Sequence, residues 1–168
     1  MTAPPAEERR LTAQHEAGHA VAALLRGGGD LVSVTIEPTA KYAGHTGFRS
    51  KVFDSAFITY AGPWAEARCQ WPDGLDLESE DDDGLTFDDY VMGAWLRNPD
   101  DWADYEAACA ADVTAFGYPA DLLHFRETAW CRELEGGPWP VIQQIAELLM
   151  RGPVAADEIR ATMMSALL

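Results

Sequence analysis

The sequence predicts a mostly α-helical domain of the α+β class, with a small β-sheet or hairpin near the N-terminus. Its 168 residues suit a single domain over residues 1–168, and 48% of them are hydrophobic, as in folded globular proteins. Residues 31–37 alternate between apolar and polar side chains, which is typical of a half-buried strand. From residue 53 onward, apolar residues recur at steps of three and four, which predicts helices.

The first expected element is a helix. It runs from Thr12, a suitable N-cap, to Arg26, with apolar residues at helical spacing. The glycines at 27–29 are expected to end it. Residues 1–10, which precede it, are expected to be flexible.

Two strands are expected next. The first covers residues 31–37, where Val32, Val34 and Ile36 share one face of the alternating pattern. A second, shorter strand is expected over residues 46–51, which would complete a small sheet.

The remainder of the chain is expected to be helical. The predicted helices cover residues 53–70, 88–96, 100–116, 120–134, 141–150 and 156–167. The segment NPDD at 98–101 is a strong helix start, because it offers a cap, a proline in the first turn and acids at the positive helix end.

Charge is distributed unevenly along the chain. There are 28 acidic residues against 12 Lys and Arg, a net charge of −16, and 13 of the acids lie in residues 73–106. Such a charge repels phosphate backbones, so no nucleic acid partner is expected. Residues 72–86 are expected to form a solvated acidic loop, with docking of a basic protein partner as the alternative. Formation of a homo-oligomer is left open.

Two further features of the sequence indicate where in the cell the protein is expected. The chain has no apolar run long enough for a membrane span or a signal peptide, so no membrane association is expected. Its three cysteines are widely spaced and contain no CxxC pair, which indicates buried thiols and not a disulfide framework. A cytoplasmic location is expected.

An HExxH motif lies inside the first predicted helix. His15 and His19 are one helical turn apart, so both imidazoles can converge on a tetrahedral Zn²⁺ ion. Glu16 projects from the neighbouring face, where it can accept a proton from a metal-bound water molecule. The alternative is a core helix whose histidines are four apart by chance. Gly18, which is unfavourable inside a helix, indicates close approach of another backbone or a substrate.

A catalytic zinc site needs a third protein ligand. The residues after His19 do not continue as HExxHxxGxxH, so this ligand must come from elsewhere in the chain. His45 and His124 are candidates, although a lone histidine is more often a polar residue with a hydrogen bond. The acidic segment offers many carboxylates.

Three motifs follow one another in the first 70 residues: TAQHEAGHAV at 12–21, VSVTIEP at 32–38 and YAGPWAEA at 60–67. Together they resemble the metal-binding helix, the following strand and the AG-x-x-AE helix of the peptidase domain in FtsH-type AAA+ zinc proteases. Beyond residue 70 the resemblance is confined to a closing pair of helices around residues 142–159.

The resemblance implies where the third ligand lies. In that family an aspartate of an Asn-Asp pair that opens a later helix completes the zinc site. The best match here is DDYVMGA at 88–94, with Asp89 in the ligand's place, an apolar residue after it and a small residue four on. Asp88 and the run Asp81 to Asp83 are alternatives. Asp89 also fits a capping box with Thr86, which would be a purely structural role.

The function implied by the resemblance is that of a zinc metalloendopeptidase. Zinc held by His15, His19 and Asp89 would lower the pKa of its water, and Glu16 would act as general base and then general acid. The sequence contains no GxxxxGK[ST] phosphate loop, so we expect ATP-independent hydrolysis of exposed or unfolded peptide segments. The strand at 32–37 could bind such a peptide along its edge. The alternative is a catalytically silent, metal-binding regulatory protein on the same fold.

Overall fold

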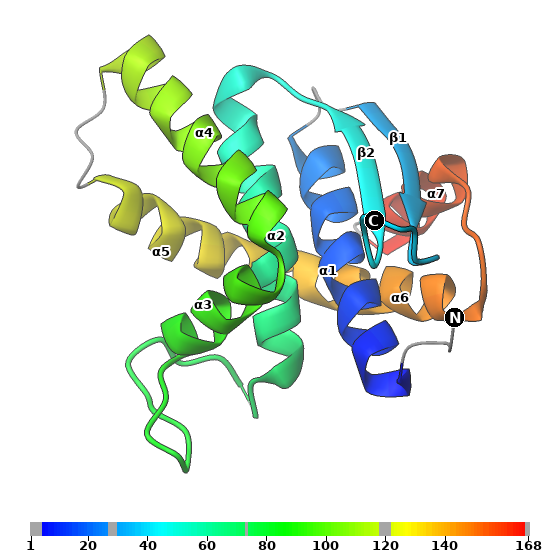
Figure 1. Cartoon of the computed structure of the whole chain (residues 1–168), viewed down its shortest axis with the longest axis horizontal. Coiled ribbons are helices and arrows are strands. Elements are labelled where there is room, and N and C mark those ends of the chain that lie inside the picture. Colours follow the sequence, from blue (N-terminus) through cyan, green and yellow to red (C-terminus); the bar gives the residue numbers. More distant parts are fainter. Residues whose placement is uncertain (1–4, 27–29, 73, 118–121, 167–168) are drawn as a thin grey trace.

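The computed structural model of the chain confirms a mostly helical α+β fold (Figure 1). It describes residues 5–26, 30–72, 74–117 and 122–166, with only the backbone described at 123 and 124. The helices are α1 (Ala6–Leu25), α2 (Val52–Gln70), α3 (Phe87–Arg97), α4 (Pro99–Phe116), α5 (Leu122–Glu135), α6 (Pro138–Arg151) and α7 (Ala156–Ala166). The strands are β1 (Asp30–Thr35) and β2 (His45–Arg49). None of the helices in these described ranges has the length and apolarity needed to span a membrane.

The six helices predicted after residue 52 are all present. Helix α6 begins at Pro138, earlier than predicted, because proline is well suited to the first turn of a helix. The predicted starting residues 120–121 of α5 and the predicted last residue 167 of α7 lie outside the described residues.

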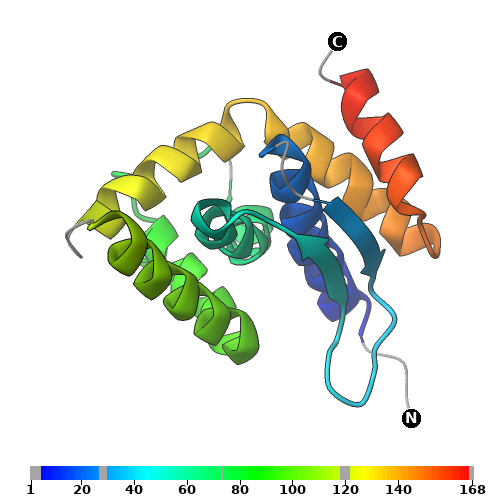
Figure 2. The same cartoon turned by 90° about the horizontal axis from the view of Figure 1, so that it is seen from above.

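Helices α1 and α2 form the centre of the molecule (Figure 2). Helices α3, α4 and α5 lie on the α2 side, the two strands and α7 lie on the α1 side, and α6 packs along α1. Every residue from 13 to 23 of α1 is buried, which identifies it as a core helix enclosed on all faces. Arg26 is its C-cap, and the glycines at 27–29 predicted to end it lie outside the described residues.

Helix α1 begins at Ala6 and not at Thr12, so residues 6–10, which were predicted to be flexible, form its first turns. The first turn carries Glu7 and Glu8, whose carboxylates stabilise the positive end of the helix. The Thr12 hydroxyl donates to the Glu8 carbonyl at 3.0 Å, a bond typical of threonine inside a helix. Thr12 is therefore an interior residue and not the cap.

The strands pair in an antiparallel sheet with a bulge between Leu31 and Ser33. The predicted inward face is confirmed for Val34 and Ile36, which are buried, but is wrong for Val32, which is 58% exposed. Leu31 is buried in its place. The physical reason is the bulge, because one extra residue reverses the facing of the residues before it.

The edge of β1 opposite β2 is partly occupied. Val154 forms an antiparallel bridge with Val34. In addition, the Arg160 guanidinium donates to the Leu31 carbonyl at 2.7 Å. A peptide that paired along residues 32–37 would have to displace these contacts, which argues against the predicted binding edge.

The acidic segment forms a loop between α2 and α3, as predicted. Asp81 organises its turn, since its Oδ1 accepts hydrogen bonds from the backbone N–H groups of Asp83 and Leu85, both at 2.9 Å. The Tyr90 hydroxyl donates to Asp81 Oδ2 at 2.5 Å. The Asp81 carboxylate therefore connects the loop to Tyr90 on α3.

The three cysteines are free thiols. Cys109 and Cys131 are buried, as predicted, whereas Cys69 is half-buried. Burial raises the pKa of the Cys131 thiol to about 11, so this thiol stays protonated and unreactive at neutral pH.

Gly18 lies where α1 and α2 approach most closely. A Cβ added at Gly18 would lie 2.3 Å from the Ala61 carbonyl oxygen and 2.8 Å from the Ala65 Cβ, both on α2. The close approach of another backbone, predicted from the glycine alone, is thus confirmed. Any side chain at this position would push the two central helices apart.

We predict that Gly18→Ala destabilises the protein by roughly 1–3 kcal/mol, because overpacking against a backbone carbonyl outweighs the gain in helix propensity. Gly93→Ala is the matched control, since a Cβ there would meet Arg97 at an ordinary 3.6 Å. That control should be neutral or stabilising. Urea unfolding of both variants measures the difference, and equal stabilities would contradict the packing argument.

Candidate metal centre

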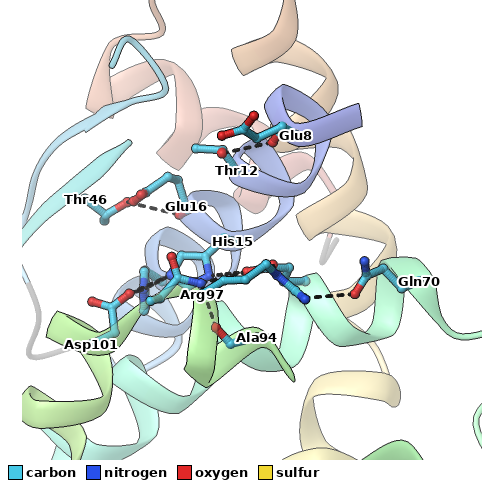
Figure 3. A network of polar contacts seen from close by, with 12 residues as sticks. Glu8, Thr12, His15, Glu16, Thr46, Gln70, Ala94, Arg97 and Asp101 are labelled. Carbon is cyan, nitrogen blue, oxygen red and sulfur yellow. Dashed lines mark hydrogen bonds and ion pairs between the residues drawn. The ribbon is translucent and has the colours of Figure 1, made fainter. Parts of the chain in front are cut away.

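Three side chains from two helices converge on one point, and Figure 3 shows two of them, His15 and Asp101. On α1, His15 and His19 are both buried, and their Nε2 atoms are 3.0 Å apart. From the first turn of α4, Asp101 Oδ2 reaches to 2.7 Å from His15 Nε2 and 3.6 Å from His19 Nε2. Within the described residues, this is the group of histidine and acidic side chains whose geometry suits a metal ion.

The donor set fits zinc. Two imidazole nitrogens and one carboxylate oxygen are the ligands of many catalytic zinc sites, which leave a further position open. A tetrahedral ion with bonds of about 2.1 Å separates its ligand atoms by about 3.4 Å. The observed separations of 2.7, 3.0 and 3.6 Å lie around this value, so small side-chain adjustments would suffice.

Helix α2 orients both imidazoles. His15 Nδ1 is 3.0 Å from Glu66 Oε2, and His19 Nδ1 is 2.8 Å from the Ile58 carbonyl oxygen. Because the carbonyl and the ionised carboxylate accept hydrogen bonds, each Nδ1 is the donor. In a metal-bound state this arrangement leaves both Nε2 lone pairs directed at the ion, as outer partners of metal-binding histidines commonly do.

Glu66 is itself held by further donors. It is 4% exposed, and its Oε1 accepts from Arg97 Nε at 2.6 Å. Asn98 Nδ2 donates to Oε2 at 2.9 Å. Three donors therefore compensate this buried carboxylate and fix its orientation toward His15.

The electrostatics of the centre favour a positive charge. Burial opposes protonation of His15, but hydrogen bonds to Asp101 and Glu66 outweigh it and raise the pKa of His15 to about 10. Burial alone would raise the pKa of Asp101, yet its bonds to His15 and His19 hold that pKa well below its usual range. Burial likewise opposes ionisation of Glu66, but contacts with His15 and Arg97 lower its pKa. Two ionised carboxylates thus flank a point where a proton or a metal ion can supply the charge.

The backbone of α2 lies directly against the imidazoles. A Cβ added at Gly62 would lie 2.3 Å from His19 Nε2 and 2.9 Å from His15 Nε2. The AG-x-x-AE segment thus supplies two features of the centre: Gly62 leaves space for the rings, and Glu66 one turn later bonds to His15.

The structure does not bring Asp89, the predicted third ligand, to the two histidines, and Asp101 is the carboxylate that lies beside them. The Asp89 carboxylate accepts from the Thr86 backbone N–H at 2.8 Å and the Thr86 hydroxyl at 2.7 Å, which forms the capping box at the start of α3. Asp88 is exposed on the same turn. The alternatives Asp81 to Asp83 belong to the acidic loop.

The sequence did contain a signal for Asp101. The NPDD segment at 98–101 was predicted to start a helix and places an aspartate in its first turn, although Pro99 and Asp100 separate Asn98 from Asp101. Asp89 matched better because Gly93 is the small residue four positions on, whereas Asp101 has Tyr105 there. Position relative to α1, which no local pattern encodes, decides between the two.

Of the two histidine candidates for the third ligand, His45 is not part of the group. His45 is exposed and stacks on Tyr42, with ring centroids 5.6 Å apart. The side chain of His124 lies outside the described residues.

A cleft of about 710 Å³ opens onto the centre. Its lining includes the three candidate ligands, Glu16, the 41–44 connection between the strands, strand β2 and the first turns of α4. Strand β2, through His45, Thr46 and Phe48, is the strand that borders this cleft. No residue of the segment 32–37, which was predicted to bind a peptide along its edge, is among the residues that line this cleft.

Comparison with known proteins does not assign a family. No protein-family profile matches the chain, and no curated protein matches it with significant sequence similarity. The chemistry of the centre therefore rests on its own residues.

Loss of a residue that only orients a metal ligand costs roughly 10- to 100-fold in metal affinity. We predict that Asp101→Asn weakens Zn²⁺ binding by at least this factor, because it removes the charged ligand itself. Asp89→Asn is the control and should only weaken the cap of α3, with a small loss of melting temperature. Titration calorimetry with Zn²⁺ measures both. Normal binding by Asp101→Asn, or lost binding by Asp89→Asn, would contradict this ligand set.

We also predict that Glu66→Gln lowers Zn²⁺ affinity by about 10- to 100-fold, because the neutral amide orients and polarises His15 less well. The control is Gln70→Ala, which removes the other contact of Arg97, at 3.1 Å, without touching a histidine. Its Zn²⁺ affinity should equal that of the parent. Equal affinities for all three proteins would show that the bond from His15 to Glu66 has no role in metal binding.

Proposed function

We propose that the protein is a zinc metallopeptidase that hydrolyses exposed or unfolded peptide segments without ATP. The observation that carries the proposal is the convergence of His15, His19 and Asp101 in a cleft that also contains the Glu16 carboxylate. Three ligands with a nearby carboxylate are the arrangement that metal-assisted hydrolysis requires.

A bound zinc ion would lower the pKa of a water molecule toward 7 and polarise the scissile carbonyl. Glu16 is the chain's own contribution to the chemistry. It follows His15 directly on α1, is 6% exposed and borders the cleft. Its carboxylate would take a proton from the attacking water and return it to the leaving amine, as general base and then general acid.

Substrate binding is assigned to β2. An extended segment beside this strand would pair main chain to main chain, which accepts many sequences. The cleft volume of about 710 Å³ lies within the roughly 300–1,000 Å³ of ordinary ligand sites. A reducing, cytoplasmic location belongs to the proposal, and the free thiols support it.

A metal-binding regulatory protein is the second candidate, and the exposed acidic loop favours it as a docking surface for a basic partner. Such a protein needs the metal ligands but has no use for Glu16. Burial of the Glu16 carboxylate beside the metal ligands therefore favours the peptidase.

We predict that Glu16→Gln keeps stoichiometric zinc and a parental melting temperature but cleaves an unstructured protein such as casein about 10²- to 10⁴-fold more slowly, because an amide cannot accept the proton. Glu37→Gln, an exposed change outside the cleft, is the control and should retain full activity. An equally fast Glu16→Gln variant would refute the mechanism. One zinc per chain without cleavage of any unfolded substrate would favour the regulatory protein.

A further inference from the structure

The Glu16 side chain is held by a residue of β2. The Thr46 hydroxyl lies 2.6 Å from Glu16 Oε2 and 3.1 Å from the Glu16 backbone oxygen (Figure 3). Both residues are buried, Thr46 at 8% exposure and Glu16 at 6%. A hydroxyl that donates to a buried carboxylate forms one of the stronger hydrogen bonds in a protein.

Gly44, the residue before β2, encloses the same carboxylate from a second direction. A Cβ added at Gly44 would lie 2.7 Å from Glu16 Oε1 and 2.9 Å from Glu16 Cγ. The backbone at Gly44 therefore lies against one oxygen while Thr46 bonds to the other. Together these contacts restrict the carboxylate to one orientation at the wall of the cleft.

The position of Thr46 is fixed by strand pairing. Thr46 is opposite Val34 in the register of the sheet, and Val34 is a buried core residue. The hydroxyl is thus carried by an element anchored in the core and not by a mobile loop.

We propose that Thr46 is a positioning residue that orients Glu16 for proton transfer, an inference that rests on the proposed peptidase function. Because β2 also borders the cleft where a peptide would lie, one strand positions both the general base Glu16 and the substrate. The distance between the Glu16 carboxylate and the scissile bond is then a property of the hairpin, and misplacement by about 1 Å can cost roughly 100-fold in rate.

A role in packing alone makes a different prediction, so two variants separate the explanations. Thr46→Val keeps the shape and removes the hydroxyl, whereas Thr46→Ser keeps the hydroxyl and removes a methyl group. The control is Thr35→Val, the same change on β1, where the hydroxyl accepts from the Glu37 N–H outside the cleft.

Kinetics on the zinc-loaded protein with casein are the first measurement. We expect Thr46→Val to lower kcat by roughly 10- to 100-fold with KM and zinc content unchanged, while Thr46→Ser and Thr35→Val stay near the parent. A Thr46→Val protein with parental kcat would overturn the proposal. So would a Thr46→Ser protein impaired as strongly as Thr46→Val, because that result indicates packing.

The second measurement needs neither zinc nor activity. Melting temperatures of metal-free Thr46→Val, Glu16→Ala and the double variant form a double-mutant cycle. Non-additive changes support the contact, and additive changes overturn it. A parent protein that binds zinc yet cleaves no unfolded substrate would instead refute the peptidase function and, with it, the catalytic role of Thr46.

Discussion

The candidate metal centre depends on how closely α1 and α2 can approach. Two missing side chains permit this approach: Gly18 admits the Ala61 carbonyl, and Gly62 leaves room for the rings of His15 and His19. Because the interior is close-packed, a methyl group at Gly18 would displace the backbone at Ala61, and a methyl group at Gly62 would displace the two imidazoles. The geometry of the centre therefore depends on the packing of α1 against α2 as well as on its polar contacts.

The polar contacts then make burial of so many ionisable groups tolerable. A buried carboxylate is costly unless donors surround it, and Glu66 has donors from His15, Arg97 and Asn98. Two of these donors come from the junction of α3 and α4, which also delivers Asp101 to the histidines. The same short junction thus supports both the ligand and the outer partner, so its position relative to α1 governs the whole centre.

Local sequence patterns predicted the helices, the small sheet and the convergence of His15 and His19 on one face of α1, because periodicity and spacing are properties of neighbouring residues. They also predicted the tight contact at Gly18. They failed for Asp89 and Asp101, which occupy equivalent first-turn positions in α3 and α4. Either aspartate satisfies the local rules for a helix start, and only the packing of α4 against α2, which brings Asp101 to His15, distinguishes them. The bulge before Ser33 was missed for a similar reason, since one extra residue leaves the composition of the strand unchanged.

The bond between His15 and Asp101 joins positions 86 residues apart in the chain. In the unfolded chain these two groups are far apart in sequence, so of the three candidate ligands only His15 and His19 are close to each other there. The complete ligand set exists only after α4 has docked. A metal ion at this centre would therefore act as a reversible crosslink, favouring the folded state in proportion to its free concentration. Chelation would then lower the thermal stability of the docked α4 along with any catalytic activity.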